Sequence, residues 1–289
     1  MINRNNQTGK NLISKNVGVL YHPKLAESRV MAAEILEFIE DFGVSAWVSS
    51  SWDEASVGDR LQDSDMIITL GGDGSMLRAA RMTTRYTLPI LGINMGTLGF
   101  LTEVQPAEWP ECIEQTLQGN YWIEKRMMVQ VKHNHQQHEV AVYEALNEVV
   151  IGRGRMARVV RLHTKINKGY LTTYTADALI ISTATGSTAY SLAAGGPILS
   201  PELENIILMP LAPHLSLDRA LILPRSTVLQ IQIQTDHTAL MTIDGQFEIE
   251  IADGDILTLT ASPWMGRFVR LHEQNYFYST LLNRLGGPQ

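Results

Sequence analysis

The first part of the chain alternates short apolar runs with longer amphipathic segments. Apolar runs of strand length occur at residues 16–21, 44–48, 66–70 and 88–94. Apolar residues recur with helical spacing in residues 24–41 and in residues 106–118. They also do so in the segment that follows the third apolar run and extends to about residue 83. Strands that alternate with helices predict a parallel sheet covered on both faces, with ligands at its carboxyl edge.

The pattern changes near residue 125, and strand-like segments dominate from there. They lie at residues 127–132, 140–151, 159–166, 228–234, 240–243, 247–251, 256–259 and 267–271. Several alternate apolar and polar residues, as in VLQIQIQT, which predicts half-solvated antiparallel strands. One further strand, residues 179–181, leads into the hydroxyl-rich stretch STATGSTAY and a short helical piece that ends at Gly195.

These patterns predict an α/β plus β protein, with an N-terminal Rossmann-like α/β domain and a C-terminal β-rich, sandwich-like domain. We expect residues 1–15 to be poorly ordered, residues 16–122 to form the α/β domain and residues 123–272 to form the β-rich domain. Residues 273–289 are expected to pack back on the first domain as a helical tail. The join near residues 120–126 is short, so we expect a ligand site between the two domains.

Composition narrows the class of protein. The 289 residues carry a formal net charge of −7, which gives no general attraction to nucleic acid or to anionic membranes. Cys112 is the only cysteine, so no intrachain disulfide can form and a reducing compartment fits best. We expect Cys112 to serve in packing. The first fifteen residues are polar and no run approaches the roughly 18 apolar residues of a membrane span, so a cytoplasmic protein is expected.

The stretch TLGGDGSMLRAAR places a carboxylate, Asp73, between Gly71, Gly72 and Gly74 directly after a predicted strand. It lacks the Lys and Ser/Thr of a P-loop, and Leu77 stands where a dinucleotide fingerprint needs a small residue. A tight turn with Asp73 capping the next helix is one interpretation. Three glycines around one acid favour a phosphate-handling loop instead.

Phosphoryl transfer to an alcohol would explain the acid in this turn. The glycine N–H groups and a divalent cation, Mg²⁺, would hold the phosphates of the donor, while Asp73 accepts the proton of the incoming hydroxyl. Arg78 lies one helical turn after Gly74, where it either faces the phosphates or is an ordinary exposed helix arginine.

Two other blocks carry polar residues in apolar surroundings. Asn147 and Glu148 lie within the long strand pattern EALNEVVIG, where a solvent-facing pair or a bulge is the structural alternative to a buried pair that binds a nucleoside. The hydroxyls and the ring of STATGSTAY suit a nucleotide, although the following helix also needs a cap. Asp244 and Gly245 match a two-residue hairpin turn.

Taken in order, four blocks resemble those of bacterial NAD kinases. They are GGDG at residues 71–74, LNE at residues 146–148, STAY at residues 187–190 with Gly195-Gly196-Pro197, and DGQ at residues 244–246. GGDG alone is shared with diacylglycerol-type lipid kinases and phosphofructokinases, whereas the ordered combination is specific. The resemblance covers the chain from residue 16 to about residue 278. It implies phosphorylation of the adenosine-ribose 2′-hydroxyl of NAD by ATP, or sometimes polyphosphate, giving NADP.

The resemblance also assigns residues. Phosphate contacts fall to Gly71, Gly72 and Gly74, and Asp73 becomes the catalytic proton acceptor. Contacts to NAD fall to Asp73, Gly74, Arg78, Asn147, Glu148, Arg158, Asp177, Thr185, Thr188, Ala189, Tyr190, Ser191, Ala212 and Gln246. In this family Asp177 often acts from a neighbouring subunit, and members assemble as homo-oligomers, usually dimers or tetramers. Ala178 and Ala184 depart from the family's usual glycine and proline.

Alternatives remain open at this point. A lipid kinase would share the GGDG turn, and a dinucleotide-sensing regulator would bind NAD without turnover. The basic stretch GRGRMARVVR suits a solvated hairpin end, and the histidines His133, His135 and His138 suggest a metal site only weakly, because they lie at a polar strand tip without cysteine. The sequence does not distinguish ATP from polyphosphate as donor, nor does it reveal use of NADH or inhibition by NADPH.

Overall fold

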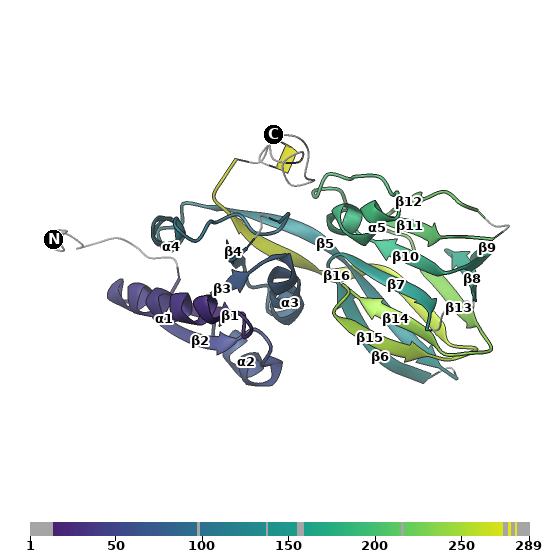
Figure 1. The fold of residues 1–289 in the computed structure, drawn as a ribbon, viewed down its shortest axis with the longest axis horizontal. Coiled ribbons are helices and arrows are strands. Elements are labelled where there is room, and N and C mark those ends of the chain that lie inside the picture. Colours follow the sequence, from purple (N-terminus) through teal and green to yellow (C-terminus); the bar gives the residue numbers. More distant parts are fainter. Residues whose placement is uncertain are drawn as a thin grey trace. The chain divides into compact units, whose positions relative to one another are not determined.

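The chain divides into two units, each with its own hydrophobic core. Unit 1 comprises residues 1–124 and 267–289, and unit 2 comprises residues 125–266 (Figure 1). This computed structural model describes residues 14–96, 99–136, 138–154, 159–214, 217–273, 277–278 and 281. The predicted poorly ordered N-terminus, the predicted C-terminal helix and Arg158 lie wholly or largely outside these residues.

Unit 1 is built on four parallel strands in the order β2-β1-β3-β4. Their bounds are β1 Asn16–Tyr21, β2 Ser45–Ser50, β3 Met66–Gly71 and β4 Ile90–Asn94. The last residues of β16 (Ile256–Arg270) pair in parallel with β4. The connections contain α1 Ala26–Asp41, α2 Glu54–Leu61, α3 Asp73–Thr83, the short helix η1 Thr84–Tyr86 and α4 Trp109–Leu117.

Helices cover both faces of this sheet. α1 and α4 pack on the face formed by Val17, Val19 and the alternate residues of β3 and β4, and Cys112 packs against the same core. α3 packs on the opposite face, where a Cβ at Gly92 would lie 2.4 Å from the Met76 sulfur. Buried, nearly uninterrupted apolar strands are what a parallel sheet covered on both faces requires. The carboxyl ends of β1, β2 and β3 therefore share one edge, where the GGDG turn begins.

Unit 2 contains two antiparallel sheets. One has the order β12-β11-β10-β7-β14-β15, and the other contains β6, β5, β16, β13, β8 and β9. The strands of the first are β7 Glu148–Arg153, β10 Ala178–Ser182, β11 Asn205–Leu211, β12 Leu221–Pro224, β14 Ala239–Ile243 and β15 Phe247–Ile251. Those of the second, besides β16, are β5 Trp122–His135, β6 His138–Ala145, β8 Val160–Ile166, β9 Gly169–Ala176 and β13 Leu229–Gln234.

The core of unit 2 lies between these two sheets. Alternate residues of both sheets, such as Val129, Leu162, Leu179 and Met241, form one buried cluster. A second cluster around Ile180 and Ile207 covers the other face of the six-stranded sheet. Unit 2 is therefore a β-sandwich (Figure 1).

The predicted fold class, an α/β domain followed by a β-rich domain, is confirmed. Two strand predictions are wrong in detail. Residues 140–151 form two strands, β6 and β7, in different sheets, and residues 256–259 and 267–271 belong to one continuous strand, β16. The helix α2 and the strands β9, β11 and β12 lie outside the predicted segments. Within the described part of the chain, no helix has the length and apolar character that crossing a membrane would require.

A buried ion cluster fixes the end of β16 in unit 1. The Arg270 guanidinium donates to the Glu124 carboxylate at 2.7 Å, to the Leu101 carbonyl at 2.8 Å and to the Glu103 carboxylate at 3.3 Å. Glu103 also accepts from the backbone N–H groups of Leu271 and His272. Arg270 thus compensates two carboxylates that are almost entirely buried.

Replacement of Arg270 is expected to destabilise unit 1 strongly. Arg270→Met removes the guanidinium that bonds to two buried carboxylates, so we expect the free energy of unfolding to fall by about 3–5 kcal/mol. Urea denaturation followed by tryptophan fluorescence measures this, because four of the five tryptophans belong to unit 1. Arg85→Met, at an exposed position of the same unit, is the control and should cost less than about 0.5 kcal/mol. Equal effects of the two changes would contradict the role of Arg270.

Candidate functional site

The GGDG turn links the buried strand β3 to helix α3. Gly71 ends the strand, and a Cβ there would lie 2.1 Å from the Ser75 hydroxyl, so no side chain fits. Added Cβ atoms at Gly72 and Gly74 would meet nothing within 4 Å. These two glycines therefore leave the amino end of α3 open, where helix N–H groups and the helix dipole favour an anion.

Asp73 is the first residue of α3. The interpretation of Asp73 as a helix cap is wrong, because Gly72 occupies the N-cap position and no side chain caps the helix. The Asp73 carboxylate instead accepts the N–H of Phe100 at 2.8 Å and that of Leu101 at 2.9 Å. Each carboxylate oxygen retains acceptor capacity beyond this single bond. The acid is thus held in place by the loop after β4 and remains partly exposed.

Gly99 makes this arrangement possible. A Cβ at Gly99 would lie 2.2 Å from the Asp73 Oδ1 atom, so only glycine lets the loop approach the carboxylate. Sequence reasoning did not assign Gly99 to the site. The available signal was its position in the second glycine pair, Gly96 and Gly99, which follows strand β4 at the same edge of the sheet as the GGDG turn.

Arg78 lies on α3 and is largely buried, with a side chain 21% exposed. Its guanidinium carbon is 5.4 Å from the centroid of the Trp52 ring, and its nitrogen is 3.6 Å from the Glu54 carboxylate. Arg78 is therefore not a freely solvated helix arginine. It belongs to a cluster of aromatic and charged side chains at the carboxyl edge of the sheet.

In unit 2, three of the sequence blocks meet where inner strands of the six-stranded sheet begin or end; this end of the strands is called one edge of the sheet below. Strand β7 lies between β10 and β14, with Ser182 opposite Glu148 and Ile243 opposite Val149. This register brings the start of β7, the end of β10 and the end of β14 together. The blocks that contain Asn147, Thr183 and Asp244 are therefore neighbours in space although they are far apart in the sequence.

Asp244 joins two of these blocks. Its carboxylate accepts the N–H groups of Leu146, Asn147 and Glu148 at 3.0, 2.7 and 3.1 Å. Asp244 and Gly245 both have positive φ, and the Gln246 N–H donates to the Ile243 carbonyl, so the predicted hairpin turn is confirmed. Sequence reasoning missed the role of the Asp244 carboxylate, which only the distant backbone of residues 146–148 reveals.

The third block is bound to the same backbone. The Asn147 carbonyl accepts from the Thr183 N–H at 2.8 Å and from the Ser182 hydroxyl at 3.2 Å, and the Thr183 hydroxyl donates to the Leu146 carbonyl at 2.6 Å. A Cβ at Gly186 would lie 2.3 Å from the Asn147 carbonyl oxygen. Backbone contacts thus fix this loop, while the Asn147 side chain takes no part in them.

Several polar atoms at this edge are buried without a partner. The Asn147 Oδ1, Glu148 Oε2 and Ser191 Oγ atoms have no hydrogen-bond partner among the described residues. Buried polar groups are rarely left unpaired in a folded protein, so such a group indicates a missing partner. Asn147 and Glu148 are consecutive at the start of β7, and two such atoms side by side in the chain are the strongest sign of a ligand in unit 2.

The other predicted residues of the hydroxyl-rich loop lie close by in the chain. Thr185 and Thr188 bound the short helix η2, and Tyr190 begins α5 Tyr190–Ala193 with a side chain 43% exposed. The Ser187 hydroxyl has a structural role, because it donates to the Ala184 carbonyl and accepts the Leu199 N–H. Ala189 and Ser191 lie in the same segment, and Gln246 follows the Asp244 turn.

Asp177 and Ala212 lie at the opposite end of these strands: Asp177 precedes β10 and Ala212 follows β11. The Asp177 N–H donates to the Leu211 carbonyl, and the Asp177 carboxylate is 3.1 Å from the Arg153 guanidinium. Four extended residues of β10 lie between Asp177 and Ser182, which places the two roughly 15 Å apart. Within one chain, the structure does not bring Asp177 and Ala212 together with Asn147.

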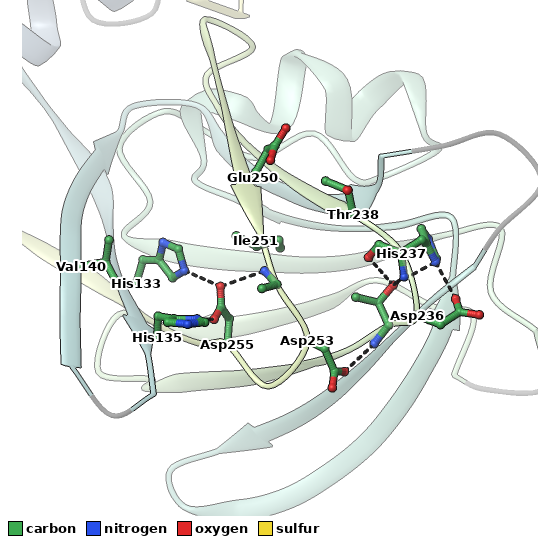
Figure 2. A pocket seen from close by; sticks show the side chains of 12 residues that line it. His133, His135, Val140, Asp236, His237, Thr238, Glu250, Ile251, Asp253 and Asp255 are labelled. Carbon is green, nitrogen blue, oxygen red and sulfur yellow. Dashed lines mark hydrogen bonds and ion pairs between the residues drawn. The ribbon is translucent and has the colours of Figure 1, made fainter.

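The histidine motif forms a separate cluster in unit 2 (Figure 2). His133 and His135 each contact a different oxygen of the Asp255 carboxylate, at 2.7 and 2.5 Å. They line a pocket of about 690 Å³ together with His237, whereas His138 is not among its lining residues. No set of three or more His, Cys, Asp or Glu side chains in the described ranges is suited to hold a metal ion.

A glycine turn at the carboxyl end of a parallel strand, and unsatisfied polar groups on a β-sandwich, are features that a nucleotide-dependent phosphotransferase requires. Comparison with known families is specific. Residues 1–121 match the model of the ATP-NAD kinase N-terminal domain, and residues 146–271 match that of the ATP-NAD kinase C-terminal domain. The chain belongs to the NAD kinase family, whose function is the phosphorylation of NAD to NADP.

Individual relatives agree with this assignment. The chain is 36% identical over 274 residues to an NAD kinase of Dehalococcoides mccartyi, covering 94% of this chain and 96% of the relative. It is 37% identical over 271 residues to an NAD kinase of Chloroflexus aurantiacus, covering 94% and 98%. Among solved structures, yeast NADH kinase complexed with NADH superposes with a TM-score of 0.82 at 25% identity, covering 97% and 92%. An Archaeoglobus fulgidus NAD kinase in complex with ATP shares the fold, with a TM-score of 0.76 at 22% identity and coverage of 95% and 100%.

Glu148 has an unusual protonation equilibrium. Burial of the side chain, and secondarily the negative charge of Asp244, raise the pKa of Glu148 from 4.5 to about 8. The carboxyl group is therefore largely protonated at neutral pH. In that form it can donate a hydrogen bond as well as accept one.

This pKa predicts how stability depends on pH. Because the folded pKa lies above the unfolded value, the folded chain holds this proton more tightly. The stabilisation is present in full below about pH 4.5 and is lost as pH rises through about 8. Glu148→Gln should remove this dependence, so between about pH 5 and 9 the wild type should lose a few kcal/mol relative to the variant.

Denaturation followed by circular dichroism at several pH values measures the difference. Glu250→Gln, at an exposed position of β15 in the same unit, is the matched control and should keep the wild-type pH profile. A Glu148→Gln profile parallel to that of the wild type would show that the carboxyl group titrates normally in the folded chain.

Proposed function

We propose that this chain transfers the γ-phosphoryl group of ATP to the 2′-hydroxyl of the adenosine ribose of NAD, giving NADP and ADP. The observation that carries the proposal is the pair of buried, unpaired polar atoms of Asn147 and Glu148 at the start of β7 in an NAD kinase family member. A ribose and an adenine offer the hydroxyl groups and ring nitrogens that these atoms lack.

Asp73 is the proposed proton acceptor. The ribose O2′ atom attacks the γ-phosphorus, its proton passes to the Asp73 carboxylate, and the bond from the γ-phosphorus to the β–γ bridging oxygen breaks to release ADP. The hydrogen bonds from Phe100 and Leu101 support this role, because they orient the carboxylate before any substrate binds. Preorganisation of this kind lowers the barrier without a cost at the moment of reaction.

The open amino end of α3 is proposed to hold the phosphates of the donor. Gly71, Gly72 and Gly74 allow close approach, and Arg78 adds a cation on the same helix. A divalent cation, Mg²⁺, would be carried by the phosphate donor, with phosphate oxygens and water as its ligands, because the described residues include no group of three or more His, Cys, Asp or Glu side chains that could hold it. When bound with ATP, Mg²⁺ would neutralise charge on the phosphates.

NAD is proposed to bind through the polar edge of unit 2. Asn147 and Glu148 would contact the nucleoside, and the remaining contacts come from the hydroxyl-rich loop and the adjacent turn. These are Thr185, Thr188, Ala189, Tyr190, Ser191 and Gln246. Arg158, assigned to NAD by resemblance, lies outside the described residues.

Asp177 and Ala212 are proposed to act in the site of a second copy. They lie on the far edge of the sheet from Asn147, and family resemblance places the equivalent acid at a neighbouring subunit's NAD. The active form would then be a homo-oligomer, a dimer or a tetramer. The lone cysteine and the acidic net charge support a cytoplasmic protein without nucleic-acid or membrane partners.

Loss of the proton acceptor should abolish turnover while substrate binding survives. In Asp73→Asn, we expect kcat for NADP formation to fall by about 10²–10⁴-fold, with the Kd for NAD changed less than about threefold. A coupled assay for NADP and calorimetric titration of NAD measure the two quantities. Because the amide can accept only one of the two N–H groups, thermal unfolding is recorded in parallel.

Assays of the wild-type protein distinguish the alternative functions. A dinucleotide-sensing regulator would bind NAD and form no NADP with ATP, and a lipid kinase would phosphorylate a diacylglycerol or sphingoid base instead. Full activity in a folded Asp73→Asn variant would exclude Asp73 as the acceptor.

Hybrid oligomers test whether Asp177 acts across subunits. Asp73→Asn and Asp177→Ala chains are each expected to be nearly inactive. In mixed oligomers, an Asp177→Ala chain supplies intact Asp73 and its Asp73→Asn neighbour supplies intact Asp177. Activity should therefore return, to about a quarter of the wild-type value for random dimers.

The matched control pairs two changes that act on one carboxylate of unit 1. Co-expressed Asp73→Asn and Gly99→Ala chains should stay inactive, because a Cβ at Gly99 displaces the Asp73 carboxylate and neither chain then supplies an intact acid. Recovery in both mixtures, or in neither, would contradict a role for Asp177 in a neighbouring site.

A further inference from the structure

A cluster of aromatic and basic side chains follows the carboxyl ends of strands β1 and β2 in unit 1. His22 and Lys24 come directly after β1, Trp52 comes after β2, and Arg78 lies on α3. None of these except Arg78 was identified from the sequence. In sheets of this type, the carboxyl edge is where ligands bind.

Trp52 is the centre of this cluster. The Lys24 ammonium is 4.8 Å from the centroid of the Trp52 ring, and the Arg78 guanidinium carbon is 5.4 Å from it. The His22 ring lies edge-on, with ring centroids 5.8 Å apart. The indole side chain is nevertheless 45% exposed. An exposed ring that holds two cations by cation–π contact keeps them oriented at the surface without neutralising them.

Nearby acids compensate only part of this positive charge. Glu54 forms a close pair with Arg81 at 2.6 Å and is 3.6 Å from Arg78. The Asp53 carboxylate accepts the Ser56 N–H and caps α2. Among the described residues, Lys24 has no carboxylate partner. Burial, together with the charges of Lys24 and Arg78, lowers the pKa of His22. An anion would relieve this repulsion.

The cluster adjoins the GGDG turn. The His22 Cβ atom is 3.9 Å from the position that a Cβ at Gly71 would occupy. The His22 Nδ1 atom accepts the backbone N–H of Lys24, so the neutral ring carries its proton on Nε2 and can donate it. Beside the same turn, the Ser75 hydroxyl is 95% buried and has no hydrogen-bond partner among the described residues. One unsatisfied hydroxyl thus lies beside the turn that the basic cluster adjoins.

We propose that His22, Lys24 and Arg78, positioned by Trp52, bind the polyphosphate chain of the phosphoryl donor. This inference rests on the proposed function, because it extends the phosphate site of the GGDG turn. Lys24 and Arg78 would pair with phosphate oxygens, and His22 would donate from Nε2. Trp52 is a positioning residue, since it orders the two cations. The ligand class is a linear polyphosphate, as found in ATP and in inorganic polyphosphate.

Steady-state kinetics separates this site from the NAD site. In Lys24→Gln and in Trp52→Leu, we expect the KM for ATP to rise about tenfold, because a charge-assisted contact to phosphate is lost or misplaced. The KM for NAD and the kcat at saturating ATP should stay within about twofold of wild type. Lys15→Gln and Trp264→Leu, at exposed positions, are the matched controls and should leave both KM values unchanged.

Direct binding measurements test the cluster without turnover. Calorimetric titration with inorganic tripolyphosphate should show binding to the wild type that weakens with added NaCl, and about tenfold weaker binding to Lys24→Gln. Circular dichroism verifies that each variant is folded. Unchanged KM for ATP and unchanged tripolyphosphate affinity in both variants would overturn the proposal.

Other outcomes are equally clear. A loss confined to ATP, with tripolyphosphate binding intact in both variants, would also overturn it, because the cluster would then contact the base. If the wild type forms no NADP from NAD and ATP, the proposed function fails. Tripolyphosphate binding would still test whether the cluster binds a polyphosphate.

Discussion

The candidate site in unit 2 depends on one carboxylate. Where the chain leaves β6 in one sheet and enters β7 in the other, three consecutive N–H groups lose their strand partners, and Asp244 accepts all three. Without this acceptor the crossing would leave buried donors unsatisfied, which costs about 1–3 kcal/mol each. With it, the backbone at Asn147 is fixed by the Asp244 carboxylate and by Ser182 and Thr183, without any bond from the Asn147 side chain. The side chains of Asn147 and Glu148 are thereby left available for a ligand.

Unit 1 also contains an aspartate that accepts backbone N–H groups, but its role is different. Asp73, like Asp244, lies beside a glycine and accepts consecutive backbone N–H groups from a distant loop. The Asp244 carboxylate is buried and serves structure, whereas Asp73 is partly exposed and has acceptor capacity to spare. An aspartate that organises a loop is thus placed, in one unit, where it can also meet a substrate. The difference that matters for a substrate is access, because only the Asp73 carboxylate is partly exposed.

Much of the fold could be predicted from sequence because apolar periodicity is local. The strand at residues 16–21 and the glycine turn after β3 follow directly from it. The break at Leu146 and Asn147 could not be located, because apolar residues flank it on both sides and the group that stabilises it lies 98 residues further along the chain. The same limit applies to the site. Asp177 is close to Ser182 in sequence, yet an extended strand puts them at opposite edges, and only pairing with β7 and β11 reveals which edge each one shares.

The contact between Gly99 and Asp73 has a consequence for divergence within the family. The carboxylate fills the volume that any side chain at position 99 would need. A substitution at position 99 would therefore displace the acid even though residue 99 itself carries no reactive group. The contact thus couples two positions that are distant in sequence: the glycine is needed only as long as the acid is present.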